Sequence, residues 1–181
     1  KKIIREEKKV LLAFHKPRGI ECTANPNVKK NVISYINYPI RIYYIGRLDK
    51  DSEGLLLLTN QGELVNKMMR SGNQHEKEYV VTVNKPVTKE FIKKMQDGVP
   101  ILGTKTRKCR VIQTGEKSFR IILTQGLNRQ IRRMCQYLGY EVKRLKRIRV
   151  MNIELGDLPV GSYREVTAQD RKSTRLNSSH T

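Results

Sequence analysis

Short apolar runs separated by turn residues dominate the pattern of this chain. Residues 10–14 and 55–58 are continuous apolar runs, each followed by a polar stretch that contains glycine. Runs of this length between turn residues predict buried strands. Further strands are predicted from alternating or β-branched positions at residues 40–45, 76–83, 109–112, 118–124, 140–145 and 148–155.

Three other segments carry apolar residues at helical spacing and predict helices over 63–70, 88–96 and 128–138, the last capped by Asn128. Strands outnumber helices in this order, and the helices interrupt them irregularly. The pattern therefore predicts an α+β domain, with a mixed, mainly antiparallel sheet and helices packed on it.

The two ends of the chain differ from its middle. The predicted elements occupy residues 8–169, which we expect to form one domain. Residues 170–181 have one apolar residue and resemble the translation of a sequencing adapter, so we expect them to be disordered and exclude them from the fold. The sequence starts without Met, and residues 1–7 are expected to be the remnant of a linker from a preceding domain.

Basic side chains far outnumber acidic ones. The 181 residues include 37 Lys and Arg against 17 Asp and Glu, which gives a formal net charge of +20. This excess indicates a polyanionic partner, nucleic acid first and an anionic membrane surface second. The basic residues are spread over predicted strands and loops rather than along one amphipathic helix, which argues against the membrane surface.

Two further classes of protein fit the sequence poorly. No apolar run approaches the roughly 20 residues that a membrane-spanning helix needs. The three cysteines are odd in number and lack the Cys-x-x-Cys spacing, which argues against a disulfide framework and against a zinc site. We expect reduced thiols in a cytoplasmic protein.

The densest group of polar residues lies directly before the apolar run 55–58. Gly46 and Gly54 bracket a polar loop in which Asp49 follows Arg47 closely. A loop that leads into a buried strand can hold a carboxylate over a rigid floor, and nearby cations keep that carboxylate ionised. By composition alone, an ordinary surface loop is the simpler interpretation of the segment.

Three ordered motifs favour a more specific interpretation. The loop Gly46-Arg-Leu-Asp49-x-x-Ser52-x-Gly54-Leu55 resembles the signature loop of RNA pseudouridine synthases. The segments 77–79 (KEY) and 128–134 (NRQIRRM) are similar to the family's Lys-x-Tyr strand and third motif. The resemblance covers residues 8–167 and is strongest to the small-ribosomal-subunit synthase A group, within its F-type branch.

This resemblance implies the pseudouridine synthase catalytic fold, with an active cleft across the sheet. It also implies isomerisation of a uridine in 23S ribosomal RNA, and a transfer-RNA anticodon uridine is open as a second target. The reaction breaks N1–C1′ and rejoins the base through C5 without redox change or net hydrolysis, so no cofactor and no metal are expected. Members of the group usually begin with an S4-type RNA-binding domain, to which the linker would lead; we expect a monomer.

The resemblance assigns the essential carboxylate to Asp49. A carboxylate could attack C1′, stabilise positive charge there, or assist deprotonation of the sugar, and the sequence leaves these routes open. Arg132 is the expected partner that clamps Asp49 through two hydrogen bonds. Tyr79 is expected to stack on the uracil or to reach a proton at C5. The expected supporting residues of the active site are Arg47, Leu48, Lys77 and Ile131, the last as an apolar wall against the base.

Basic residues outside these motifs are expected to bind RNA phosphates. The predicted contacts are Arg129, Arg133, Lys143, Arg144, Lys146 and Arg147. The competing interpretation is a non-catalytic RNA-binding or ribosome-assembly module that uses the same basic cleft. A pure binding module has no need of Asp49, and its presence together with Tyr79 and Arg132 favours the enzyme.

Overall fold

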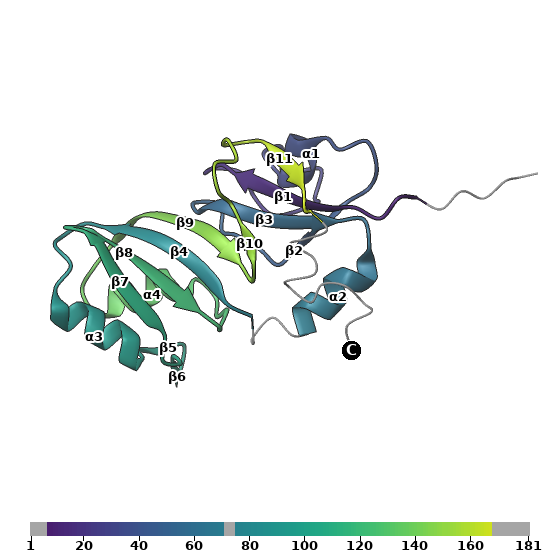
Figure 1. Cartoon of the computed structure of the whole chain (residues 1–181). Coiled ribbons are helices and arrows are strands. Elements are labelled where there is room, and N and C mark those ends of the chain that lie inside the picture. The colour runs from purple at the N-terminus through teal and green to yellow at the C-terminus, as the bar shows by residue number, and fades with distance from the viewer. Residues whose placement is uncertain (1–6, 71–74, 168–181) are drawn as a thin grey trace, which may run out of the picture.

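One twisted sheet organises the protein, whose computed structural model describes residues 7–70 and 75–167 (Figure 1). Strands β3 (Glu53–Thr59) and β9 (Val142–Val150) pair in parallel, and every other pairing within this sheet is antiparallel. The α+β class and the mixed, mainly antiparallel sheet are thereby confirmed. The path across the sheet is β11 (Tyr163–Glu165), β1 (Leu11–Lys16), β3 (Glu53–Thr59), β9 (Val142–Val150), β4 (Lys77–Val83), β8 (Ser118–Leu123) and β7 (Arg110–Gly115), with β2 (Tyr43–Ile45) beside β3 and β10 (Ile153–Glu154) beside β9.

The described helices are short and lie beside the sheet (Figure 1). Thr88 caps α3 (Lys89–Asp97), the helix predicted over 88–96: its side chain accepts a hydrogen bond from the amide of Phe91 at 3.0 Å. The predicted Asn128 cap is wrong: Arg129 occupies the N-cap position in a left-handed conformation, without a side-chain capping bond. The helices are α1 (Val32–Ile36), α2 (Gly62–Arg70), α3 (Lys89–Asp97) and α4 (Gln130–Tyr137), and a small hairpin joins β5 (Pro100–Ile101) to β6 (Thr104–Lys105).

The sheet consists of two halves that are covered differently. Strands β1 and β3 send alternate side chains into two separate apolar clusters, one on each face. Strands β4 and β8 bury one row of side chains under α3 and α4 and leave the other row partly exposed. Strand β9 lies between the halves and joins them (Figure 1).

Strand β9 corrects one expectation from the sequence. The predicted strands 140–145 and 148–155 are instead one strand, Val142–Val150, followed by the short β10. The pairing register of β9 against β4 shifts by one residue: Glu78 pairs with Arg149, the next residue Tyr79 pairs with Arg147, and Ile148 is skipped. Such a bulge disturbs the alternation of polar and apolar residues, which explains why the pattern appeared to break there.

Several expectations concern the ends of the chain or its cysteines. Residues 1–6 and 168–181 lie outside the described residues, and with them most of the predicted linker and all of the predicted adapter segment. Cys22, Cys109 and Cys135 are free thiols, of which the second is half-buried and the others buried. No helix of the described residues is long and apolar enough to cross a membrane.

Candidate active site

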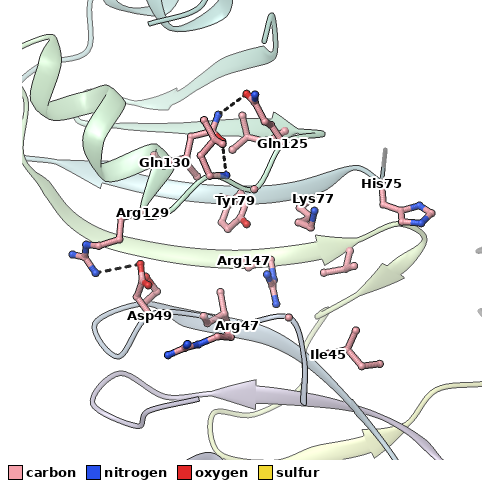
Figure 2. A pocket seen from close by; sticks show the side chains of 18 of the residues that line it. Ile45, Arg47, Asp49, His75, Lys77, Tyr79, Gln125, Arg129, Gln130 and Arg147 are labelled. Carbon is pink, nitrogen blue, oxygen red and sulfur yellow. Dashed lines mark hydrogen bonds and ion pairs between the residues drawn. The ribbon is translucent and has the colours of Figure 1, made fainter. Parts of the chain in front are cut away.

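A cavity of about 460 Å³ lies where the two halves of the sheet meet (Figure 2). The loop before β3 lines one side of it, and strand β4, strand β9 and the start of α4 line the other. This volume falls in the range of small-molecule sites. Besides Asp49, five of the residues predicted as catalytic or supporting line the cavity, namely Arg47, Leu48, Lys77, Tyr79 and Ile131.

Buried residues and hydrogen bonds hold the loop that carries Asp49 in place. Leu48 is buried in the apolar cluster under β1 and β3, so the residue before Asp49 anchors the loop. The fully buried Lys16 ammonium donates hydrogen bonds to the carbonyls of Ile20 at 2.7 Å and Lys50 at 3.4 Å. A turn closes at Ser52, whose amide donates to the carbonyl of Asp49 at 3.0 Å. The carboxylate of Asp49 is therefore presented by a rigid support.

Gly54 ends this loop where β3 closely approaches β9. It pairs with Arg147 in the parallel ladder of β3 and β9. A Cβ at this position would overlap the backbone of Arg147, and the φ of Gly54 is +110°. Only glycine tolerates both conditions. The glycine of the signature loop thus brings β9 against the loop that carries Asp49.

The cation that contacts Asp49 is not the predicted one. Arg129 lies 3.2 Å from the Asp49 carboxylate, and both of its terminal nitrogens also contact the Asp51 carboxylate, at 3.1 and 3.0 Å. Arg129 has a positive φ of 48°, an uncommon conformation for a side-chain-bearing residue that turns it away from the helix. The expected clamp of Asp49 by Arg132 is therefore wrong in this structure.

Arg132 instead holds the loop beside Asp49. Its guanidinium donates to the carbonyl of Asp51 at 3.1 Å and to the Ser52 hydroxyl at 3.0 Å, and it lies 3.5 Å from the Asp51 carboxylate. Burial lowers the pKa of Arg132. The hydrogen bond from Arg129, and then the charge of Arg132, lower the pKa of Asp51. Asp51 is thus the residue of this loop that both arginines contact.

Strand β4 supplies the opposite wall. Lys77 and Tyr79 lie two residues apart and both face the cavity, as the strand period requires (Figure 2). Ile131 is buried at the start of α4 and contributes an apolar surface beside them. Burial and the nearby charge of Arg147 lower the pKa of Lys77. Burial also lowers the pKa of His75, and Lys77 adds to that effect.

The predicted RNA-binding residues do not form one surface. Arg133 donates to the backbone and side chain of Asn128, and the Lys143 ammonium lies 3.4 Å from the Glu141 carboxylate. Arg144 pairs with the buried carboxylate of Glu53, and Lys146 is half-buried on β9. Arg147 is 5% exposed and lines the cavity, and Arg129 contacts the loop that carries Asp49. The six residues thus separate into a cavity group and an outer group.

No group of three or more His, Cys, Asp or Glu side chains suited to a metal occurs in the described parts of the chain. The cavity instead joins one carboxylate to several cations and to a tyrosine. Such a set can bind a polyanion, stack on a planar base and place a carboxylate beside a sugar. Its chemistry is suited to a nucleoside within RNA.

Comparison with known sequences agrees with this arrangement. The sequence profile of the family described as RNA pseudouridylate synthase matches residues 10–137. The chain belongs to this family. The match includes the loop of Asp49, the strand of Tyr79 and the start of α4, which together line the cavity.

Individual relatives in the pseudouridylate synthase family extend the likeness. The dual-specificity RNA pseudouridine synthase RluF of Escherichia coli (strain K12) is 56% identical over 158 residues, 87% of this chain and 54% of that protein. The ribosomal large subunit pseudouridine synthase B of Bacillus subtilis (strain 168) is 35% identical over 185 residues, covering 98% of this chain and 76% of that protein. The chain spans about half the length of the RluF relatives it matches.

A solved structure agrees with the fold. A crystal structure of a pseudouridylate synthase superposes with a TM-score of 0.85 at 25% sequence identity, covering 93% of this chain and 75% of the other. The expected pseudouridine synthase fold is thereby confirmed.

The sequence did not identify three contributors to the site. Asp51 lay within the recognised loop, but its role as the partner of two arginines depends on the approach of α4. Lys16 had no predicted role, although burial of its ammonium against three carbonyls makes it a support of the loop. Leu145 of β9 also lines the cavity. An apolar residue between basic neighbours was its only signal.

Proposed function

We propose that this chain isomerises a uridine of 23S ribosomal RNA to pseudouridine, and that a transfer-RNA anticodon uridine is a second substrate. One relative is named a dual-specificity enzyme and the other a ribosomal large subunit enzyme, which supports a target in the large subunit and a second specificity. The observation that carries the proposal is the Asp49 carboxylate, which lies at the cavity 3.2 Å from Arg129. An enzyme with these substrates works in the cytoplasm.

The cavity is suited to a base that has left the RNA stack. Extruding a uridine costs a few kcal/mol, which phosphate contacts to basic residues at the rim offset. The Tyr79 ring can stack on the uracil, a contribution of about 1–3 kcal/mol. Ile131 closes the other side with apolar surface. The sugar then lies toward the loop, where Asp49 reaches C1′.

Asp49 supplies the charge that the reaction needs. Arg129 lies 3.2 Å from it and fixes its direction. An ionised carboxylate can bond to C1′, stabilise positive charge on the sugar, or take a proton from it. Each route breaks N1–C1′ and forms C5–C1′ while the atoms of the nucleoside stay the same. Because oxidation state and water content are unchanged, side chains suffice for this chemistry.

Substitution of Asp49 tests the proposal. With a 23S ribosomal RNA transcript labelled with tritium at uridine C5, we expect Asp49→Asn to reduce tritium release at least about 10³-fold. The dissociation constant for the RNA should stay within about threefold, because the side chain keeps its shape. Asp157→Asn removes an exposed carboxylate from the turn after β10 and serves as the matched control.

The possible results separate the two functions. Full activity of Asp49→Asn would reject the catalytic proposal. A wild-type protein that binds the transcript and a transfer-RNA anticodon stem-loop tightly, yet converts no uridine in either, would favour the non-catalytic RNA-binding module.

A further inference from the structure

Arg147 is a buried cation with hydrogen-bond donors to spare. Its side chain is 5% exposed, and its Nε donates to the carbonyl of Leu55 at 2.9 Å. Within residues 7–70 and 75–167, its two terminal nitrogens form no hydrogen bond and no ion pair with a carboxylate. The side chain lines the cavity (Figure 2). A buried guanidinium whose donors face a cavity calls for an acceptor or an anion from a ligand.

Three features of the backbone fix where Arg147 points. It pairs with Gly54 across the β3–β9 ladder, and its Nε is held by the residue after that glycine. On the other side it pairs directly with Tyr79 of β4. The register shift next to it leaves Ile148 unpaired. Arg147 therefore lies on the cavity face immediately beside the tyrosine that is proposed to stack on the uracil.

Lys77 adds a second cation to the same region. It lies two residues from Tyr79 on the same face of β4 and also lines the cavity. The charge of Arg147 contributes to lowering the pKa of Lys77, which indicates that the two positive groups act on each other. Asp49, the carboxylate of the cavity, lies nearer the loop side and contacts Arg129 (Figure 2).

The isomerisation creates a negative charge where these cations lie. When N1–C1′ breaks, both bonding electrons stay with the uracil, and the anion spreads its charge over N1 and the two carbonyl oxygens. The base then turns, and C5 forms the new bond to C1′. C5 loses its proton and N1 gains one, so the product has the composition of the substrate. Cations held in a water-poor site stabilise such a developing anion strongly.

We propose that Arg147 and Lys77 bind the detached uracil through its carbonyl oxygens and stabilise its negative charge while it turns. This inference rests on the proposed function, because it assigns the leaving-group side of the same reaction. Asp49 acts on the sugar, whereas Arg147 and Lys77 act on the base. A fixed, planar guanidinium beside the stacking ring also retains the base when no covalent bond holds it.

The test measures binding and turnover separately on the tritium-labelled 23S transcript. We expect Arg147→Gln and Lys77→Met each to lower kcat about 100-fold, the effect of removing one donor to a developing anion. The RNA dissociation constant should stay within about threefold. Arg147→Lys keeps the charge and should recover about tenfold of the lost kcat. Lys117→Gln is the charge-matched control. Lys117 lies in the exposed β7–β8 turn, at the opposite end of β8 from Leu123, which lines the cavity.

A modified substrate distinguishes anion stabilisation from a structural defect. In 5-fluorouridine the fluorine withdraws electrons, so the departing base needs less help from the protein. The rate at which the N1-linked nucleoside disappears is measured after nuclease digestion. The factor by which Arg147→Gln lowers this rate relative to wild type should be about tenfold smaller with 5-fluorouridine RNA than with uridine RNA. A structural defect would slow cleavage of both RNAs equally.

Three outcomes would overturn the inference while leaving the proposed function intact, provided that the wild type is active and Asp49→Asn is not. One is kcat within threefold of wild type in both variants. Another is an Arg147→Gln variant with unchanged kcat and a raised RNA dissociation constant. If the salt dependence of its RNA binding is also weaker by about one phosphate contact, Arg147 is a phosphate ligand. The last is an equal loss with both RNAs. If Arg147→Gln lowers the melting temperature of the protein, the two RNAs are compared with Lys77→Met instead, which leaves the β3–β9 contact unchanged.

Discussion

The two halves of the sheet bury their strands in different ways. In β3 every residue from Glu53 to Thr59 is buried, and the leucines alternate between the clusters on the two faces. In β8 burial alternates, with Phe119, Ile121 and Leu123 under the helices and the residues between them partly exposed. The half that contains β1 and β3 has an apolar core on each face of the sheet. The half that contains β4 and β8 has one core, and its other face is partly exposed.

The difference shows why the site lies between the halves. The doubly covered half provides the fixed loop of Asp49, and the singly covered half provides Tyr79 and Lys77. Neither half forms the cavity alone. Strand β9 joins them and adds Arg147, and it can do so because Gly54 allows it close to the loop. Rigid elements on both sides hold reacting groups more accurately than loops alone would.

The contact between the halves should be the most sensitive position. Gly54→Ala places a Cβ against the backbone of Arg147 at a φ that alanine disfavours. We expect the free energy of unfolding to fall by more than about 3 kcal/mol and kcat to fall with it. Urea denaturation and the tritium assay measure the two effects.

Gly156→Ala controls for backbone strain in that experiment. Its φ is +56°, and no atom lies within 4 Å of the added Cβ. This variant should lose only about 1 kcal/mol. Equal losses in the two variants would mean that the close approach of β9 has no special importance.

The second prediction concerns the two kinds of burial. Leu56→Ala and Leu57→Ala remove side chains from opposite faces of β3, and each should lower the free energy of unfolding by about 2–5 kcal/mol. In β8, Ile121→Ala should lose a similar amount, whereas Ile122→Ala on the open face should lose about 1 kcal/mol. Four similar values would contradict the distinction between the halves.

The smallest expected effect is a shift in pH dependence at the junction. Burial and Arg147 lower the pKa of Lys77, so its charge is lost at a lower pH than that of an ordinary lysine. Arg147→Gln removes one cause and raises this pKa, so the alkaline fall of kcat should move to higher pH. His75, which also lies beside Lys77, titrates at more acidic pH because its pKa is lowered too. A pH profile of kcat from neutral to alkaline values decides whether the limb moves; an unmoved limb would show that Lys77 does not act as a cation.

Local patterns predicted well those elements whose side chains follow one period. The helix capped by Thr88 and the apolar strand at 55–58 were predicted near their observed bounds. Helix α1 and strand β11 were not predicted, since each is very short and shows little period. Strand β9 was divided into two because its bulge interrupts the alternation.

For the site, the ordered motifs identified the residues that line the cavity but not their contacts. Asp49, Tyr79 and Ile131 line it, and their proposed roles stay predictions. The partner of Asp49 was assigned to Arg132, whereas Arg129 makes that contact because its left-handed backbone turns the side chain toward the loop. A left-handed conformation is uncommon at an arginine, and no residue type at this position signals it.

The sequence by itself determined the family, the mixed sheet, the basic character and which carboxylate lines the cavity, because each is carried by residue types at short spacing. Only the tertiary structure decided which arginine contacts Asp49, that Lys16 supports its loop, and that Arg147 turns into the cavity. Those contacts join residues about 34 to 92 positions apart. They are fixed by how closely two strands approach and where one of them bulges, and these are properties of packing rather than of any local run of residues.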